Sequence, residues 1–426
     1  MREQRFFILF VAVLFGCLAL AACGGDDDDS DDDDTGFDDD TGDDDSGDDD
    51  DTGDDDSGDD DSEGPWDPTE LGPYEVGNRS YVFVDDTRWD PATNGDRTIL
   101  TEVWYPAADE AAELPRDVLR NFFGQWDEEV LERLAQEGAT PEELANFDRE
   151  TGSARDAPLH PVDGPFPIIL FSHGLGGIRF QSYTLSEYIA SHGFYVVAPD
   201  HTGSCLAAAL PDGVVEFRED LVPISFDQRK HDLSFLIDVF AGLNAFDPDG
   251  FFTGRIDIEQ VGTLGHSFGG TCAVEVAKDD NRVRAAVNMA SFMFPWLPEG
   301  FDASTMFMIA LEDDSMGDMI FFMRWGYDMA VPPKFKLEFF DSGHFTFTDV
   351  CDLIPSLMGD GDGCGMGERR ATGEPFEFVG HDEAFAVIDS YVTAFFGYNL
   401  RSETHMLEFL LENRFPDRIE YDLELP

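Results

Sequence analysis

Positive charge is scarce in this 426-residue chain. Lysine and arginine together number 26 against 91 aspartates and glutamates, which gives a formal net charge of -65, and only four residues are lysine. Nucleic-acid phosphates are bound mainly through basic side chains, so a chain this acidic repels them. We therefore expect no nucleic-acid partner, and the same repulsion favours neutral or zwitterionic ligands over anionic ones.

Long apolar runs are also missing beyond the N-terminus. Residues 6–22 carry no charge, follow two arginines and are too short for a comfortable membrane span, which is typical of a signal peptide. Two alanines directly before Cys23 resemble the lipobox of bacterial lipoproteins, where the chain is cleaved and the new N-terminal cysteine is lipidated. We predict a signal peptide over residues 1–22 and a lipid anchor in the cell envelope at Cys23. Gly24 favours the outer membrane, and an uncleaved anchor helix is the alternative.

Residues 23–63 have almost nothing apolar to bury. Within them, residues 26–61 are almost wholly Asp, Ser, Thr and Gly, and such a run repels itself and stays extended. We predict a disordered linker that holds the rest of the chain off the membrane. Weak calcium binding is the alternative, although a disordered repeat offers no fixed ligand cage. The composition then becomes globular, so residues 64–426 are predicted to form one domain.

Cysteine is scarce as well, with six in the chain. Cys351 and Cys364 lie on either side of an Asp- and Gly-rich loop and are the disulfide pair that we favour, because export permits disulfides. The sequence leaves the connectivity open. Within the loop, Asp360-Gly361-Asp362-Gly363 lacks the rest of a calcium-binding loop, so we interpret it as an ordinary turn and predict no metal site.

Short apolar segments and helical segments alternate through the predicted domain. The continuous apolar run at residues 167–171 is typical of a strand buried on both faces. Further strands are expected at residues 79–84, 98–105, 194–198, 260–264, 283–288, 306–310 and 334–340, and helices at residues 182–191, 232–243 and 270–277. This order predicts an α/β fold with a mostly parallel central sheet and helices on both faces. Residues 109–157 interrupt it with helical spacing, either as a cap near an active-site mouth or as a plain surface insertion.

A serine flanked by glycines lies between an expected strand and an expected helix, in Gly265-His266-Ser267-Phe268-Gly269. The motif matches Gly-x-Ser-x-Gly, in which the turn from strand to helix is so sharp that the flanking residues must be tiny. Such a turn holds the serine hydroxyl exposed at the carboxyl edge of the sheet. We predict that Ser267 is a nucleophile, and a chance glycine-rich connection is the alternative.

A serine hydroxyl is a poor nucleophile unless a base takes its proton, and after this type of turn the base comes late in the chain. His344 directly follows the strand expected at residues 334–340, where a loop can carry its ring over Ser267. His381 and His405 lie in or beside helical segments. We therefore predict that His344 is the general base.

The carboxylate that orients the histidine is expected between the serine and the histidine. Glu312-Asp313-Asp314 follows the strand expected at residues 306–310, at the end where such an acid belongs. We choose Asp314 as the acid, with Asp313 as the alternative. In so acidic a chain, the third interpretation is that both are ordinary solvated carboxylates.

The oxyanion of a tetrahedral intermediate needs backbone N–H donors. One candidate is the amide of Phe268, directly after the predicted nucleophile. The second is expected in the glycine-rich loop at residues 172–177, where we choose Leu175, with Gly174 as the alternative. His173 precedes the nucleophile in the chain and is interpreted as a brace for this loop.

Three segments together resemble the platelet-activating factor acetylhydrolases of the plasma type and their bacterial dienelactone-hydrolase-like relatives. They are Phe171-Ser172-His173-Gly174-Leu175-Gly176-Gly177, Ala190-Ser191-His192-Gly193-Phe194 and Gly265-His266-Ser267-Phe268-Gly269-Gly270. The similarity runs from about residue 72 to residue 398. It implies an α/β-hydrolase fold and hydrolysis of short acyl or lipid esters without metal or cofactor. Ser267, His344 and the amides of Leu175 and Phe268 match positions that serve in that family.

One position departs from this family. Its triad aspartate would fall at Ala290, so either the acid has moved one strand later or the triad is incomplete. The segment 310–315 is similar to the acid loop of cutinase-like polyester hydrolases, which favours a moved acid. The resemblance therefore implies an acetylhydrolase-like esterase. A cutinase-like polyester hydrolase and a non-catalytic surface lipoprotein that binds through the same scaffold are the alternatives.

Overall fold

The computed structural model describes residues 66–161, 164–298, 301–358 and 362–426. These residues form the compact unit that begins at Trp66. The predicted signal peptide, Cys23 and the predicted linker lie outside the described residues. Across the described ranges, no helix is long and apolar enough to cross a membrane.

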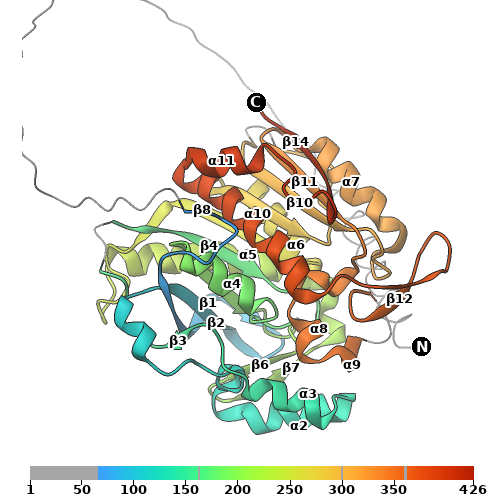
Figure 1. Cartoon of the computed structure of the whole chain (residues 1–426). Helices are drawn as coiled ribbons and strands as arrows, with labels where there is room; N and C mark the ends of the chain where they lie inside the picture. Colours follow the sequence, from blue (N-terminus) through green and yellow to red (C-terminus); the bar gives the residue numbers. More distant parts are fainter. Residues whose placement is uncertain (1–65, 162–163, 299–300, 359–361) are drawn as a thin grey trace, which may run out of the picture. The chain divides into compact units, whose positions relative to one another are not determined.

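A mostly parallel sheet forms the centre of this unit (Figure 1), as predicted. In the described part of the chain, ten strands pair in the order β14-β11-β10-β9-β8-β4-β5-β2-β1-β3. From β11 to β5 all neighbours are parallel, whereas β14, β2 and β1 pair antiparallel toward the edges. The strands are β1 (Glu75–Asp90), β2 (Gly95–Ala107), β3 (Ala154–Arg155), β4 (Phe166–Ser172), β5 (Tyr195–Asp200), β8 (Ile256–His266), β9 (Val283–Met289), β10 (Ser304–Ala310), β11 (Lys334–Phe339) and β14 (Ile419–Glu424).

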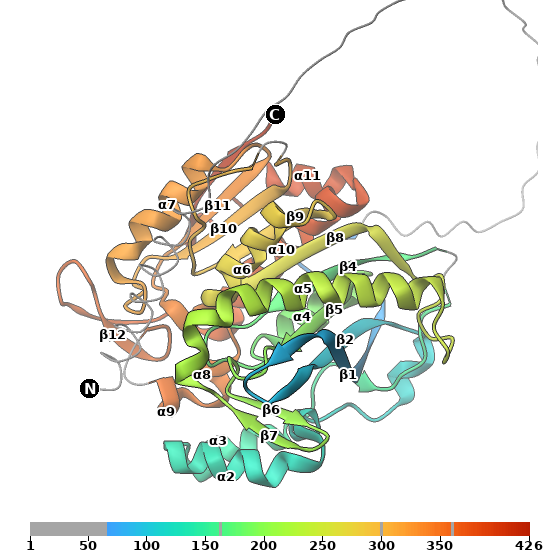
Figure 2. The same cartoon turned by 180° about the vertical axis from the view of Figure 1, so that it is seen from behind.

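Helices cover both faces of the sheet, which is why the central strands are apolar without alternation: every residue of β5 and β10 is buried. α4 (Tyr183–Ser191) contacts α10 (His381–Arg401) on the face shown in front in Figure 1. α5 (Val222–Ala245) contacts α6 (Phe268–Asp279) on the opposite face, seen in Figure 2. The expected helices at 182–191, 232–243 and 270–277 are confirmed, although α5 begins earlier than predicted. α7 (Ile320–Met329) and α11 (Thr404–Leu410) follow β10 and α10.

The helical insertion predicted at residues 109–157 is confirmed as a series of short helices. They are η1 (Asp109–Glu113), η2 (Leu119–Trp126), α2 (Asp127–Glu137), α3 (Pro141–Ala145) and η3 (Asn146–Asp148). The Trp126 ring N–H donates to the carbonyl of Leu210, in the hairpin of β6 (Ala207–Leu210) and β7 (Gly213–Glu216). The Asn146 side chain donates to the carbonyl of Leu353, in α8 (Val350–Leu353). These contacts join the insertion to segments that follow β5 and β11, which favours a cap over a plain surface insertion.

Cys351 and Cys364 form the predicted disulfide. It joins α8, which precedes α9 (Pro355–Met358), to the segment before a second hairpin, β12 (Met366–Glu368) and β13 (Pro375–Glu377). This hairpin was not predicted, because its strands are three residues each and largely exposed, so they carry no hydrophobic pattern.

Parallel strands bring their carboxyl ends to one edge of the sheet. Ser267 directly follows β8, the acidic loop follows β10, and His344 lies shortly after β11. Because β8, β9, β10 and β11 are consecutive neighbours in the sheet, residues distant in the sequence meet at this edge.

Candidate active site

Ser267 sits in the sharp turn between β8 and α6. Its backbone is in the left-handed region, at φ 55° and ψ -128°, which is costly for a residue with a side chain and is held by the surrounding structure. A Cβ on Gly265 would lie 2.2 Å from the carbonyl oxygen of Gly269, and one on Gly269 would lie 2.0 Å from that of Ser172. No larger residue fits at either glycine, so the predicted turn is confirmed with its steric cause.

Three side chains form a continuous hydrogen-bonded relay at this turn. The Ser267 hydroxyl Oγ lies 2.8 Å from Nε2 of His344, and the Nδ1 of His344 donates to Oδ2 of Asp313 over 2.8 Å. Asp313 is fully buried, whereas Ser267 is 8% exposed at the sheet edge. The carboxylate fixes the ring so that Nε2 presents its lone pair to the serine hydroxyl.

The choice of Asp314 as the acid is wrong, and its neighbour Asp313, the alternative, holds the position. The Asp314 side chain is 68% exposed and lies 3.5 Å from the guanidinium of Arg370. The Asp313 carboxylate also accepts the backbone N–H of Met316 at 2.7 Å, and this local turn directs it inward. Consecutive side chains of a turn point in different directions, so the acidic run alone did not reveal which one faces the ring.

Opposing effects act on the ionisation of this pair. Burial alone would lower the pKa of His344, but the adjacent Asp313 carboxylate raises it above its usual value. Burial raises the pKa of Asp313, and the ring N–H bond opposes that rise. The net effect is a raised pKa of His344, so the Asp313 carboxylate makes the ring a stronger base.

Two residues that sequence reasoning missed support the backbone of His344. The Nε2–H of His266 donates to the His344 carbonyl at 2.8 Å, and its Nδ1 accepts from the Gln181 amide at 3.1 Å. Burial lowers the pKa of His266 well below its usual value, so the ring stays neutral, as this pair of bonds requires. The Gln181 side-chain oxygen in turn accepts the Gly174 N–H at 3.1 Å, which links the His344 loop to the glycine-rich loop.

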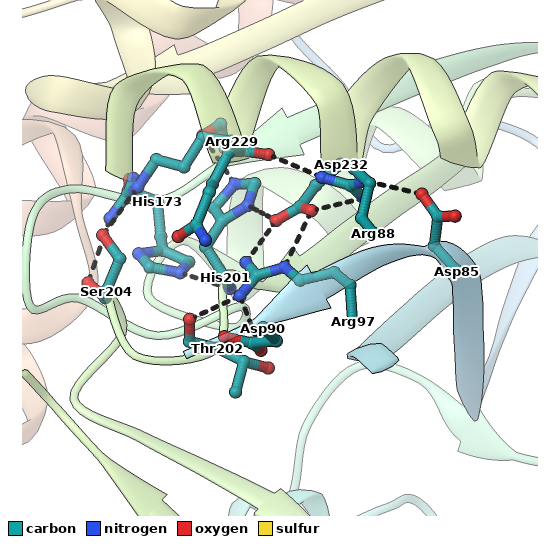
Figure 3. Close-up of polar contacts among 12 residues, drawn as sticks. Asp85, Arg88, Asp90, Arg97, His173, His201, Thr202, Ser204, Arg229 and Asp232 are labelled. Carbon is teal, nitrogen blue, oxygen red and sulfur yellow. Dashed lines mark hydrogen bonds and ion pairs between the residues drawn. The ribbon is translucent and has the colours of Figure 1, made fainter. Parts of the chain in front are cut away.

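The buried guanidinium of Arg229, on α5, supports the glycine-rich loop at residues 172–177. Arg229 donates to the carbonyls of His173, Gly174 and Ser204 (Figure 3). Nδ1 of His173 donates to the Gly174 carbonyl at 2.7 Å, and its Nε2 accepts the backbone N–H of His201 at 3.2 Å. His173 is therefore the predicted brace.

Backbone N–H groups of this loop are mostly engaged. Those of Gly174, Gly176 and Gly177 donate to Gln181, to the Ser204 carbonyl and to the Gly174 carbonyl. Over the ranges that the structure describes, no acceptor is paired with the N–H of Leu175. This pattern favours Leu175 over Gly174 as the donor to a bound oxyanion, beside the amide of Phe268 at the start of α6.

Two family models match the chain. The model of platelet-activating factor acetylhydrolase, isoform II, matches residues 66–235, and that of the alpha/beta hydrolase fold matches residues 167–316. The ferulic acid esterase from Streptomyces cinnamoneus superimposes with a TM-score of 0.60 at 25% identity, covering 78% of this chain and 91% of that chain. The chain has the α/β-hydrolase fold.

Curated relatives of this hydrolase are also acetylhydrolases. The platelet-activating factor acetylhydrolase of Cavia porcellus is 28% identical over 156 residues, and that of Bos taurus is 26% identical over 159 residues. Each match covers 30% of this chain and spans 36% of the relative's length. The expected relationship to the acetylhydrolase family is therefore confirmed, over a limited part of both chains.

The hydrolase departs from that family at Ala290, where the resemblance places an aspartate. Ala290 is fully buried at the end of β9, with φ 49°, and its N–H donates to the Met308 carbonyl of β10 at 2.8 Å. The carboxylate that reaches His344 comes instead from Asp313, after β10. Of the two expectations, a moved acid and an incomplete relay, the geometry agrees with the moved acid.

A second Ser-His-Asp relay begins at Ser172, the first residue of the glycine-rich loop. The Ser172 hydroxyl lies 3.0 Å from Nε2 of His201, whose Nδ1 donates to Asp232 at 2.9 Å. Arg97 and Arg88 pair with the same carboxylate at 2.6 Å and 2.9 Å (Figure 3). Although burial opposes it, Arg97 holds the pKa of Asp232 well below its usual range.

All three residues of this second relay are fully buried, so no substrate reaches them. We interpret the relay as a structural brace at the end of β4, where the glycine-rich loop begins. Sequence reasoning did not find it, because its members come from three separate elements. Among the described residues, no group of His, Cys, Asp or Glu side chains could hold a metal ion.

Proposed function

We propose that this α/β-hydrolase is a serine carboxylic ester hydrolase. The observation that carries the proposal is the relay from the Ser267 hydroxyl at the sheet edge through His344 to the buried Asp313 carboxylate, with 2.8 Å at each step. The strained turn at Ser267 and the acetylhydrolase and esterase relatives support the same reaction class.

Each group has a role in the proposed reaction. As Ser267 Oγ attacks the ester carbonyl, His344 Nε2 takes its proton and Asp313 stabilises the resulting imidazolium. The amides of Leu175 and Phe268 stabilise the oxyanion. The imidazolium then protonates the leaving alcohol, and a water activated by the neutral ring hydrolyses the acyl-serine. No metal or cofactor takes part in this scheme.

Short-acyl or lipid esters are the proposed substrates. The acetylhydrolase match covers residues 66–235, which include the glycine-rich loop that faces the reacting carbonyl. The net charge of -65 disfavours anionic esters by repulsion. The second candidate is a polymeric or aromatic ester. Segment 310–315, which carries the acid, resembles the acid loop of cutinase-like polyester hydrolases, and a ferulic acid esterase has a similar structure.

We predict that Ser267→Ala lowers turnover of p-nitrophenyl acetate by roughly a million-fold, because the variant lacks the nucleophile. Asp313→Asn should lower kcat by about 10⁴-fold, since the ring loses its orienting carboxylate. The matched control Asp314→Asn should change kcat by less than about twofold, because that carboxylate is exposed. Steady-state kinetics of the three purified variants measure this. Undiminished activity of Ser267→Ala would remove the proposal.

The pH profile tests the base. His344 accepts a proton only when neutral, so kcat/KM should fall as the pH drops through its pKa. Because Asp313 raises that pKa above the ordinary 6.5, the acid limb of the profile should lie above pH 6.5. In Asp313→Asn the limb should move to lower pH, since the opposite charge is lost while burial still acts. A limb at the same pH in both proteins would contradict this assignment.

A substrate panel separates the two ester classes. We expect higher kcat/KM for an acetylated ether phospholipid and p-nitrophenyl acetate than for methyl ferulate, and little release of soluble product from an aliphatic polyester film. The measurement is the initial rate with each of the four substrates at the same active-site concentration. Preferential hydrolysis of the film or of methyl ferulate would replace the acetylhydrolase-like assignment with the second candidate.

We also propose that the enzyme is lipid-anchored through Cys23 in the cell envelope, which rests on the sequence pattern alone. When the full chain is expressed in a bacterium with lipoprotein processing, it should incorporate labelled palmitate and sediment with the membranes. Cys23→Ala should abolish the label, whereas Cys17→Ala should not. Equal labelling of Cys23→Ala and the parent chain would rule out this anchor.

A further inference from the structure

The Asp362 carboxylate is hydrogen-bonded to two different loops, the one that carries His344 and the one that carries Asp313. Oδ1 accepts the backbone N–H of His344 at 2.8 Å and that of Asp314 at 2.9 Å. Oδ2 accepts the backbone N–H of Ser315 at 2.8 Å and the Ser315 hydroxyl. One side chain therefore ties the main chain of the base to the main chain directly after the acid.

The backbone of this segment also touches the base loop. The Phe345 N–H donates to the Asp362 carbonyl at 2.8 Å. A Cβ on Gly343 would lie 2.1 Å from the carbonyl carbon of Asp362, and one on Gly363, at φ 118°, would lie 2.7 Å from the Thr346 nitrogen. The two segments therefore pack backbone to backbone, which leaves the Asp362 carboxylate little freedom to shift.

Three residues that follow Asp362 hold this segment in place. Cys364, two residues later, is bonded to Cys351. The Arg369 guanidinium pairs with Glu312 at 3.1 Å and also with Asp341, so it joins the acid loop to the end of β11. The Arg370 guanidinium donates to the backbone carbonyl of Asp313. The β12–β13 hairpin, which was not predicted, therefore contacts the loop that carries Asp313.

We propose that Asp362 is a positioning residue. By bonding the backbone of both loops, it holds the His344 ring and the Asp313 carboxylate at hydrogen-bonding distance from each other. This inference rests on the proposed esterase function. The acid and the base stand on loops after two different strands, so their 2.8 Å contact depends on how those loops are joined. A carboxylate with four donors from both loops fixes that distance before substrate arrives, and a misplacement of about 1 Å costs roughly a hundred-fold in rate.

The charge of Asp362 contributes as well. The titratable and charged groups that face the His344 ring are Asp313, Asp362 and the neutral His266. Both carboxylates favour the imidazolium that forms when Ser267 loses its proton. Of the two carboxylates, only Asp313 is hydrogen-bonded to the ring, so Asp362 acts through the main chain and through its charge.

The test is Asp362→Asn, which keeps the shape of the side chain but removes its charge. Its amide NH₂ cannot accept a hydrogen bond, so in one orientation the side chain loses the N–H bonds of His344 and Asp314, and in the other it loses the N–H bond of Ser315. We expect kcat to fall about tenfold with KM nearly unchanged, and the acid limb of the profile to move down by roughly half a pH unit. A residue that only stabilises the fold would leave the acid limb where it is.

The matched control is Asp352→Asn, which removes the same charge within the same disulfide-closed loop. Its carboxylate is 45% exposed and pairs with Arg149, away from the relay. We expect parental kcat and an unmoved acid limb. Titration with a fluorophosphonate gives the concentration of reactive Ser267, so kcat is expressed per competent site and misfolded protein does not count. The double variant Cys351→Ser/Cys364→Ser should shift both quantities in the direction of Asp362→Asn.

The outcomes separate this inference from the proposed function. If Asp362→Asn keeps the parental kcat per titrated site and the parental acid limb, the positioning role is overturned while the esterase stands. The positioning role is also overturned if Asp362→Asn and Asp352→Asn lose kcat to the same extent and neither variant moves the acid limb of the pH profile. Undiminished activity of Ser267→Ala would instead contradict the proposed esterase function.

Discussion

The bond between the Asp313 carboxylate and the His344 ring is the contact on which the site depends, because it joins loops that follow neighbouring strands. β10 and β11 run parallel with residues paired from Thr305 to Ala310, so both chains leave the sheet at one edge. His344 must then reach back past β10 and β9 to the serine after β8. The Asp313 carboxylate holds the ring there, together with the bonds that Asp362 and His266 make to the His344 backbone.

Two Ser-His-Asp relays with similar bond lengths have different consequences in this protein. In the one at Ser172, complete burial and two arginines on the Asp232 carboxylate make a stable ionic cluster that braces a loop. In the one at Ser267, a left-handed turn carries the hydroxyl to the sheet edge. Access, rather than the hydrogen-bond pattern, separates a structural relay from a candidate catalytic one.

Local steric rules made part of this site predictable. Gly265 is required by backbone contacts within a few residues, whereas Gly269 is required by the close approach of Ser172 at the end of β4. Both glycines mark the turn in the sequence, so Ser267 could be found there, and the order of strands then led to His344. The inward direction of Asp313 depends on one hydrogen bond to Met316, which an acidic run does not reveal. Arg229, Gln181 and Asp362 act through contacts between distant elements, and no local pattern marks them.

The buried Ala290 explains how an acetylhydrolase-like loop can work with an acid from elsewhere. Ala290, directly after β9, has a positive φ, and its N–H is bonded to β10. The glycine-rich loop and the serine turn are fixed by Arg229 and by β8, independently of the acid. Because the acid has only to reach Nδ1, on the side of the ring away from the serine, a carboxylate after β10 meets that requirement as well as one after β9.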